Sequence, residues 1–141
     1  MAYENVDTQQ LRSSLNACKS SLNCVTSASL TRMSDSIWTG QAKNNLTSAI
    51  GKLVKTRYKD LSDKIDEYLK VVDQIENYQK LSSSSGSLSS QKASKEAELR
   101  KEQAKPNKDV DKIRRLQTEI GSLNSQINSV NSQKNSISIN I

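Results

Sequence analysis

Apolar residues recur along the first part of the chain at alternating intervals of four and three positions, which is the spacing of one buried face of an α-helix. This pattern predicts a helix from about residue 8 to residue 35, with Asp7 or Thr8 capping its N-terminus. The apolar face consists of Leu11, Leu15, Cys18, Leu22 and Val25, and after one slip in phase it resumes at Leu30, Met33 and Ile37. We therefore expect this helix to pack against a neighbouring helix.

A second and longer pattern begins after Gly40 and predicts a helix that continues to about Leu81. Its most regular part alternates strictly by four and three positions and consists of Val54, Tyr58, Leu61, Ile65, Tyr68, Val72 and Ile75. Tyr58 and Tyr68 are expected to be core residues rather than contacts. This helix is about a dozen residues longer than the first. The apolar seam at its far end must therefore be covered either by another part of this chain or by a partner.

The run Ser82-Ser83-Ser84-Ser85-Gly86-Ser87 is the clearest helix breaker in the sequence and predicts a flexible linker over residues 82–87. A third helix is expected from about Leu88 to Lys105, since the residue before Pro106 is disfavoured in helical geometry. Its seam is thin and contains mainly alanine.

The fourth pattern is the most regular and predicts a helix over the last part of the chain, with Asp109 and Asp111 in its first turn, where the helix dipole favours negative charge. Its seam consists of Ile113, Leu116, Ile120, Leu123, Ile127, Val130 and Ile137. The predicted fold is all-α, with elongated helical hairpins and coiled-coil seams: a hairpin over residues 1–81, the linker, and a second hairpin over residues 88–141.

The third helix carries too few large side chains to cover the fourth, and exposed apolar seams usually mark partner surfaces. We therefore predict a partner-binding seam on the distal second helix and on the fourth helix. It consists of Leu61, Ile65, Tyr68, Val72, Ile75, Ile113, Leu116, Ile120, Leu123, Ile127 and Val130.

Composition narrows the chemistry. The chain has no histidine, two cysteines and four widely separated glycines, so the commonest general base, a zinc site and a glycine-rich phosphate loop are all missing from the sequence. We expect a non-enzymatic protein without a metal or other cofactor. Cys18 lies on the apolar face as a small core residue, whereas Cys24 lies off it, and their separation of about 9 Å along a helix is too long for a disulfide.

Net charge is +6, which would suit an acidic partner, but no basic run exceeds two residues and stacking aromatics are few. Binding to nucleic acid or to a charged surface is therefore the least favoured hypothesis. No apolar segment reaches the ~18 residues needed to span a membrane. The N-terminus lacks the features of a cleaved signal peptide, so we expect synthesis in the cytoplasm and, if the protein leaves, another route.

The two first helices meet at Ile37-Trp38-Thr39-Gly40, which contains the only tryptophan of the chain. Glycine suits the geometry of a turn, and an indole covers the open end of a helix pair. A helix, a Trp-x-Gly turn at Trp38 and Gly40, and a second helix resemble the WXG-type proteins of type VII secretion in Gram-positive bacteria. The added C-terminal part makes the chain most similar to the helical accessory partners of LXG-type toxins.

The resemblance implies a protein that binds the helical N-terminal domain of a toxin, or another small helical accessory protein, and stabilises or targets the toxin for export. It also implies homodimers or heterodimers and export without cleavage. The family's Tyr-x-x-x-Asp/Glu signal usually follows the second helix, whereas here only Tyr3 and Asp7 have that spacing. A self-associating structural coiled-coil protein with no secretion role remains the alternative.

Overall fold

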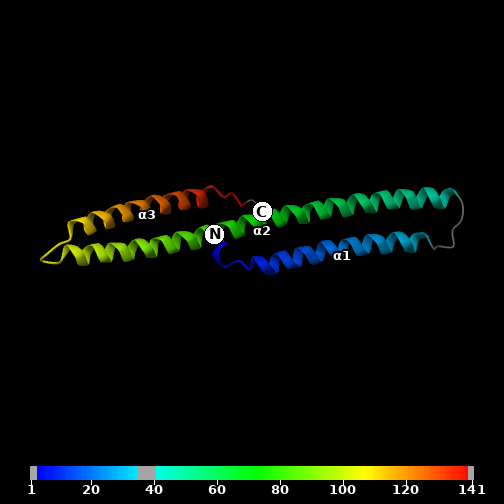
Figure 1. The fold of residues 1–141 in the computed structure, drawn as a ribbon. Helices are drawn as coiled ribbons and strands as arrows, with labels where there is room; N and C mark the ends of the chain where they lie inside the picture. The colour runs from blue at the N-terminus through cyan, green and yellow to red at the C-terminus, as the bar shows by residue number, and fades with distance from the viewer. Residues whose placement is uncertain (1–2, 35–40, 140–141) are drawn as a thin grey trace. The chain divides into compact units, whose positions relative to one another are not determined.

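In the computed structural model, which describes residues 3–34 and 41–139, all regular structure is helical (Figure 1). A short 3₁₀ turn, η1 (Tyr3–Asn5), precedes three α-helices: α1 (Thr8–Ser34), α2 (Gln41–Gln103) and α3 (Val110–Ser136). The predicted all-α class is confirmed. Trp38 and Gly40, on which the family resemblance depends, lie outside the described residues.

Helix α1 has the predicted bounds to within one residue. Its N-terminus is capped by Asp7, whose Oδ1 atom accepts a hydrogen bond of 2.9 Å from the backbone N–H of Gln10. Such a cap satisfies one of the backbone donors that the first helical turn leaves without a partner. Of the two candidate caps, Asp7 therefore has this role, and Thr8 is the first helical residue.

Helix α2 corrects two predictions, because it runs unbroken for 63 residues through the serine-rich stretch. Residues 82–87 are helical rather than a linker, and the third predicted helix is the continuation of the second. Serine and glycine disfavour a helix by only about 0.5–1 kcal/mol per residue, an amount that tertiary packing readily overrides.

The packing that overrides this low helix propensity repeats at regular intervals along the serine-rich stretch of α2. Partly buried positions of α2 recur every three or four residues, whereas the serines between them are mostly exposed. The partly buried positions that follow this period are Tyr78, Leu81, Ser85, Leu88, Lys92, Lys95 and Leu99, and Gln79, Ser82 and Glu96 beside them are also partly buried. This seam is not visible as an apolar pattern in the sequence, because Ser85, Lys92 and Lys95 occupy positions where an apolar residue is usual.

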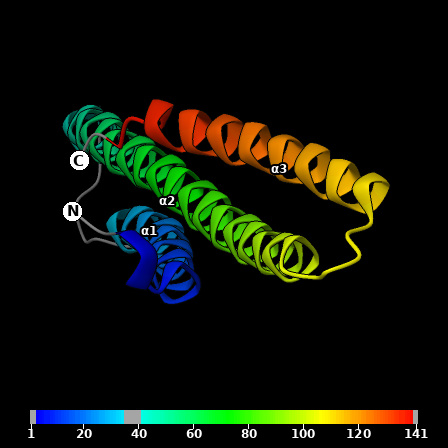
Figure 2. The same cartoon turned by 90° about the vertical axis from the view of Figure 1, so that its left-hand side faces the viewer.

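These seam residues contact α3 in antiparallel register. Ser85 Oγ donates to Asn131 Oδ1 at 2.9 Å, and Lys92 Nζ donates to Asn124 Oδ1 at 3.0 Å. A step of seven residues forward on α2 therefore matches a step of seven residues backward on α3. Figures 1 and 2 both show α3 lying beside the C-terminal half of α2.

The connection between α2 and α3 follows the predicted stop signals. Helix α2 ends at Gln103, shortly before Pro106, and Asp109 caps α3 by accepting a hydrogen bond of 2.9 Å from the backbone N–H of Lys112. Asp109 is thus the N-cap, while Asp111 lies in the first turn.

The chain divides into two compact units, and the division falls inside α2 between Asp73 and Gln74 rather than at the serines. We call residues 7–73 the α1 unit, and residues 1–6 with 74–140 the α3 unit. In the α1 unit, Ile65 and Val72 are buried. Ion pairs of Arg12 with Asp73 (2.6 Å) and Lys19 with Asp66 (2.5 Å) join α1 to α2 in antiparallel register.

In the α3 unit, the N-terminal segment is held against α2. The side-chain amide of Gln79 donates hydrogen bonds of 2.9 Å to the carbonyl oxygens of both Tyr3 and Val6. The rings of Tyr3 and Tyr78 meet edge to face at 5.8 Å, and Lys134 Nζ lies 5.6 Å from the centre of the Tyr78 ring. Tyr3, which has the spacing of the export signal with Asp7, therefore packs against α2.

Candidate interaction surface

The α1 unit has an open apolar groove between its two helices, and this groove is our candidate functional site. It is lined by Leu15, Ala17, Cys18, Ser21 and Leu22 of α1 and by Tyr58, Leu61, Ile65 and Tyr68 of α2. The α2 residues are spaced by three, four and three positions, so they form one stripe along the helix. Ion pairs between α1 and α2 fix the register of the groove walls.

Large apolar side chains are unusually exposed in this unit. Leu61 and Tyr68 are each 50% exposed, whereas Ile65 between them is 6% exposed. Leu11 and Leu53, on the same two helices, are 42% and 60% exposed. Single exposed leucines are normal on protein surfaces, but Leu61 and Tyr68 lie together in the lining of one apolar groove, and such exposed apolar patches usually mark a surface that another molecule covers.

The structure separates the predicted partner-binding seam into two parts. Leu61 and Tyr68 are accessible in the groove, and Tyr68 is half exposed rather than a core residue. Ile65, Val72 and Ile75 are buried within the chain itself, so they stabilise the fold and are not open to a partner.

The seam of α3 is also occupied by the chain's own packing. Leu116 is 4% exposed, and the other predicted seam positions are partly buried: Ile113, Ile120, Leu123, Ile127 and Val130. The expectation that α3 lacks a cover failed because small and polar residues of α2, such as Ser85, approach it closely and hydrogen-bond to it. The cover of α3 is therefore the seam of mixed composition from Tyr78 to Leu99 and not the alanine seam, since Ala93 and Ala97 are exposed.

Cys18 is exposed and lines the groove, which corrects its assignment to the core. Its neighbours Leu15, Lys19 and Leu22 are partly buried, and Lys19 pairs with α2, so the contact between the helices passes to one side of Cys18. Cys24, the second free cysteine, is exposed and outside the groove lining.

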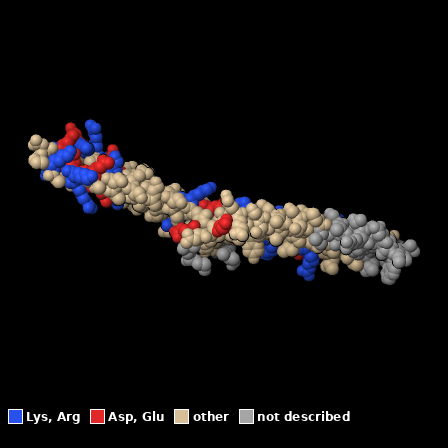
Figure 3. All heavy atoms as spheres, turned by 90° about the horizontal axis from the view of Figure 1, so that it is seen from below, with Lys and Arg blue, Asp and Glu red and all other residues tan. Residues whose placement is uncertain are grey.

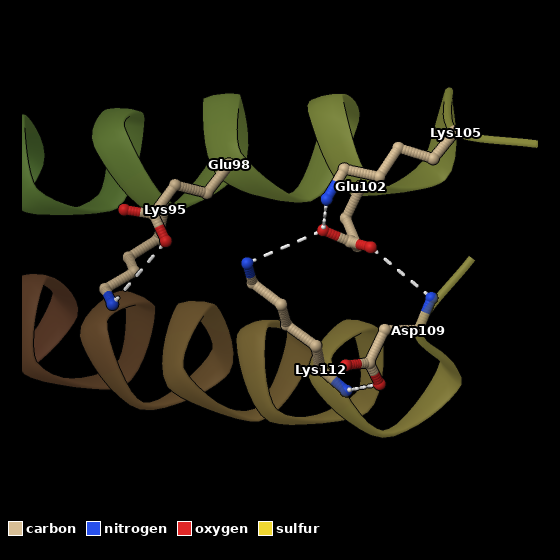
Figure 4. Close-up of polar contacts among 6 residues, drawn as sticks. All are labelled: Lys95, Glu98, Glu102, Lys105, Asp109 and Lys112. Carbon is tan, nitrogen blue, oxygen red and sulfur yellow. Dashed lines mark hydrogen bonds and ion pairs between the residues drawn. The ribbon is translucent and has the colours of Figure 1, made fainter. Parts of the chain in front are cut away.

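Charged side chains of both signs gather at the end of the α3 unit where α2 connects to α3 (Figure 3). Glu102 lies among charged residues of this connection (Figure 4). This carboxylate is buried, and it receives a hydrogen bond of 2.7 Å from Lys105 Nζ and one of 3.3 Å from the backbone N–H of Asp109. Lys112 Nζ lies 3.5 Å away. The hydrogen bond from Lys105 lowers the pKa of Glu102, burial opposes this, and Asp109 and Lys112 lower the pKa further. Through these contacts, Glu102 of α2 binds both the connecting segment and the first turn of α3.

This cluster predicts a pH-dependent effect of Glu102→Gln. Because the folded-state pKa of Glu102 lies below the usual value of about 4.5, the charged carboxylate stabilises the fold above that pH and loses this effect as the pH falls through the folded-state pKa. Melting curves should therefore show the variant less stable than the wild type at pH 7, with the difference closing towards pH 3. Glu98→Gln, an exposed position one turn earlier, is the control. An equal difference at both pH values would contradict this account.

Other features that define functions are not found in the described part of the chain. Residues 3–34 and 41–139 contain no group of three or more potential metal ligands, and no helix there is long and apolar enough to cross a membrane. Comparisons with protein-family models, curated proteins and solved structures found no match. The open groove of the α1 unit and the Trp38-x-Gly40 motif are therefore the features that bear on function.

Proposed function

We propose that this protein is a non-enzymatic helical partner that binds the N-terminal helical domain of an LXG-type toxin and stabilises or targets it for type VII export. The observation that carries the proposal is the open apolar groove of the α1 unit, with Leu61 and Tyr68 half exposed in its lining. The Trp38-x-Gly40 motif supplies the link to type VII secretion through its family resemblance.

The form of the groove favours a helix as its occupant. Its walls are two antiparallel helices, and their apolar residues repeat at three- and four-residue intervals, which matches the ridges of a third helix. On the α1 wall, Ala17, Cys18 and Ser21 are small, so a helix backbone can approach that wall closely. A helix with its own four-three apolar seam would therefore fill the groove.

Self-association as a structural coiled coil is the second candidate, and one observation favours it. Arg57, Asp60, Lys64 and Glu67 form an exposed line beside Leu61, with alternating signs at intervals of three, four and three. In an antiparallel second copy, Arg57 could face Glu67 of that copy and Asp60 could face its Lys64. In the single chain, Lys64 and Glu67 pair with each other at 2.5 Å. In a dimer they would exchange this contact for contacts with the second copy.

The two candidates are separated by one measurement of mass. We would determine the mass by light scattering during size exclusion, first for the protein alone and then after co-expression with the helical domain encoded beside it. A defined complex of the two chains is expected. A homo-oligomer that ignores the neighbouring domain would reject the toxin-partner function and favour self-association.

A further inference from the structure

A second groove lies on the other side of the contact between α1 and α2, and it is cationic. It is lined by Leu22 and Asn23 of α1 and by Lys55, Tyr58, Lys59, Ser62 and Asp63 of α2. Leu22 and Tyr58 also line the apolar groove, so these two residues separate the grooves. Lys52, three residues before Lys55, extends the same helical face.

The stretch of sequence that contains Lys52, Lys55 and Lys59 is rich in positive charge. Helix α2 contains Lys43, Lys52, Lys55, Arg57 and Lys59 before its first carboxylate, Asp60. Residues 20–59 carry six Lys/Arg against one Asp/Glu, which accounts for +5 of the total charge of +6.

Six lysines of the described residues form ion pairs, and the lysines of this groove are among those that do not. Lys19, Lys64, Lys92, Lys95, Lys105 and Lys112 each form an ion pair. By contrast, Lys52, Lys55 and Lys59 are exposed, and none pairs with a carboxylate among the residues that the structure describes. Asp63 is the single carboxylate of the groove lining, at its far end. The charge of the groove is therefore left for an external anion.

We propose that this cationic groove binds the acidic face of a helix of the partner, with carboxylates at positions i, i+3 and i+7. This inference depends on the proposed function and adds the chemistry of the partner to it. Lys52, Lys55 and Lys59 are separated by about 4.5 and 6 Å along the axis, and side chains with the same spacing on a second helix repeat at the same intervals. The apolar body of that helix would pack on Leu22 and Tyr58, both partly buried in the groove.

We assign a helix rather than a nucleic acid to this groove because its lining has few aromatic residues. Tyr58 is the one aromatic residue in it and is partly buried, so a stacking platform for successive bases is missing from this groove.

The test uses the full chain and two synthetic helical peptides. Both have the same apolar seam, and one carries three Glu at i, i+3 and i+7 where the other carries Gln. We expect the Glu peptide to bind the wild type about tenfold more tightly at low salt, as three exposed ion pairs of up to ~0.5 kcal/mol each would give. Lys55→Gln combined with Lys59→Gln should remove most of this preference.

The matched control is Lys70→Gln combined with Lys80→Gln, which removes the same charge from exposed positions of α2 outside the groove. It should keep the preference for the Glu peptide. The proposal is overturned if both double variants lose the preference equally, if neither loses it, or if the wild type shows none. It is also overturned if a 20-nucleotide single-stranded DNA binds more tightly than the Glu peptide and depends on Lys55 and Lys59.

Failure of this inference is distinguishable from failure of the proposed function. A co-expressed complex that forms without any preference for the Glu peptide would leave the proposed function intact and reject the cationic groove. Preference for the Glu peptide without a co-expressed complex would support the groove and reject the toxin domain as partner.

Discussion

Replacing Leu116 with alanine is expected to lower the free energy of unfolding of the α3 unit by about 2–4 kcal/mol. Leu116 is 4% exposed and is the most buried apolar residue of α3. Its removal deletes dispersion contacts and leaves a cavity that two packed helices can only partly close. Chemical denaturation followed by circular dichroism would measure the loss.

The same substitution should act on the serine-rich segment of α2. Residues 82–90 contain seven serines and a glycine, so their helix depends on packing against α3 rather than on intrinsic propensity. Amide hydrogen exchange there should accelerate by about 30- to 1000-fold, which is the 2–4 kcal/mol expressed as a ratio.

Val110→Ala is the matched control, because Val110 belongs to the same helix and is 68% exposed. It should change the free energy of unfolding by less than about 0.5 kcal/mol. If Leu116→Ala left the exchange of residues 82–90 unchanged, the serine-rich helix would be stable by itself, and our explanation of its continuity would be wrong.

Local signals predicted the start of α1 and the end of α2 to within about two residues, because each of these ends is determined by a few neighbouring residues. Asp7 and Thr8 could both be named as caps from their side-chain oxygens and their position before the apolar pattern, and the structure selects Asp7. Pro106 indicated where α2 ends. These effects act over one helical turn. The all-α class followed from the same periodicity.

The continuity of α2 could not be predicted in this way, because it depends on residues about 45 positions apart. Ser85 is a helix-weakening residue in the local sequence and a seam residue opposite Asn131 in the fold. The sequence shows the first property directly and the second only once the register of α3 is known. The division of the chain inside α2 was hidden for the same reason.

The candidate site was predicted in part. Leu61 and Tyr68 were recognised from heptad spacing, but the same spacing also selected Ile65 and Val72, which the chain buries itself. Periodicity identifies an apolar face without showing which side of it a neighbouring helix covers. The offset of α1 towards one side of that face, fixed by Lys19 with Asp66, leaves Leu61 and Cys18 in the open groove.

Leu61→Asp is expected to weaken partner binding at least about thirtyfold while leaving the protein folded. Leu61 is half exposed in the chain alone, so the substitution should change the free energy of unfolding by less than about 1 kcal/mol. In a complex the carboxylate would be buried opposite an apolar seam without a partner, which is costly. Affinity for the co-expressed helical domain, measured by titration calorimetry, gives the effect on binding.

The two cysteines provide a second measurement in the same protein. Cys18 lines the groove and Cys24 does not, and both thiols are exposed, so a bound helix should slow the alkylation of Cys18 and leave that of Cys24 unchanged. Leu53→Asp is the matched control, since Leu53 is 60% exposed on the same helix but outside the groove lining. Equal losses of affinity in the two variants, or equal protection of the two cysteines, would show that the partner does not dock in this groove. Loss confined to Leu61→Asp, with protection confined to Cys18, would place the partner helix between α1 and α2.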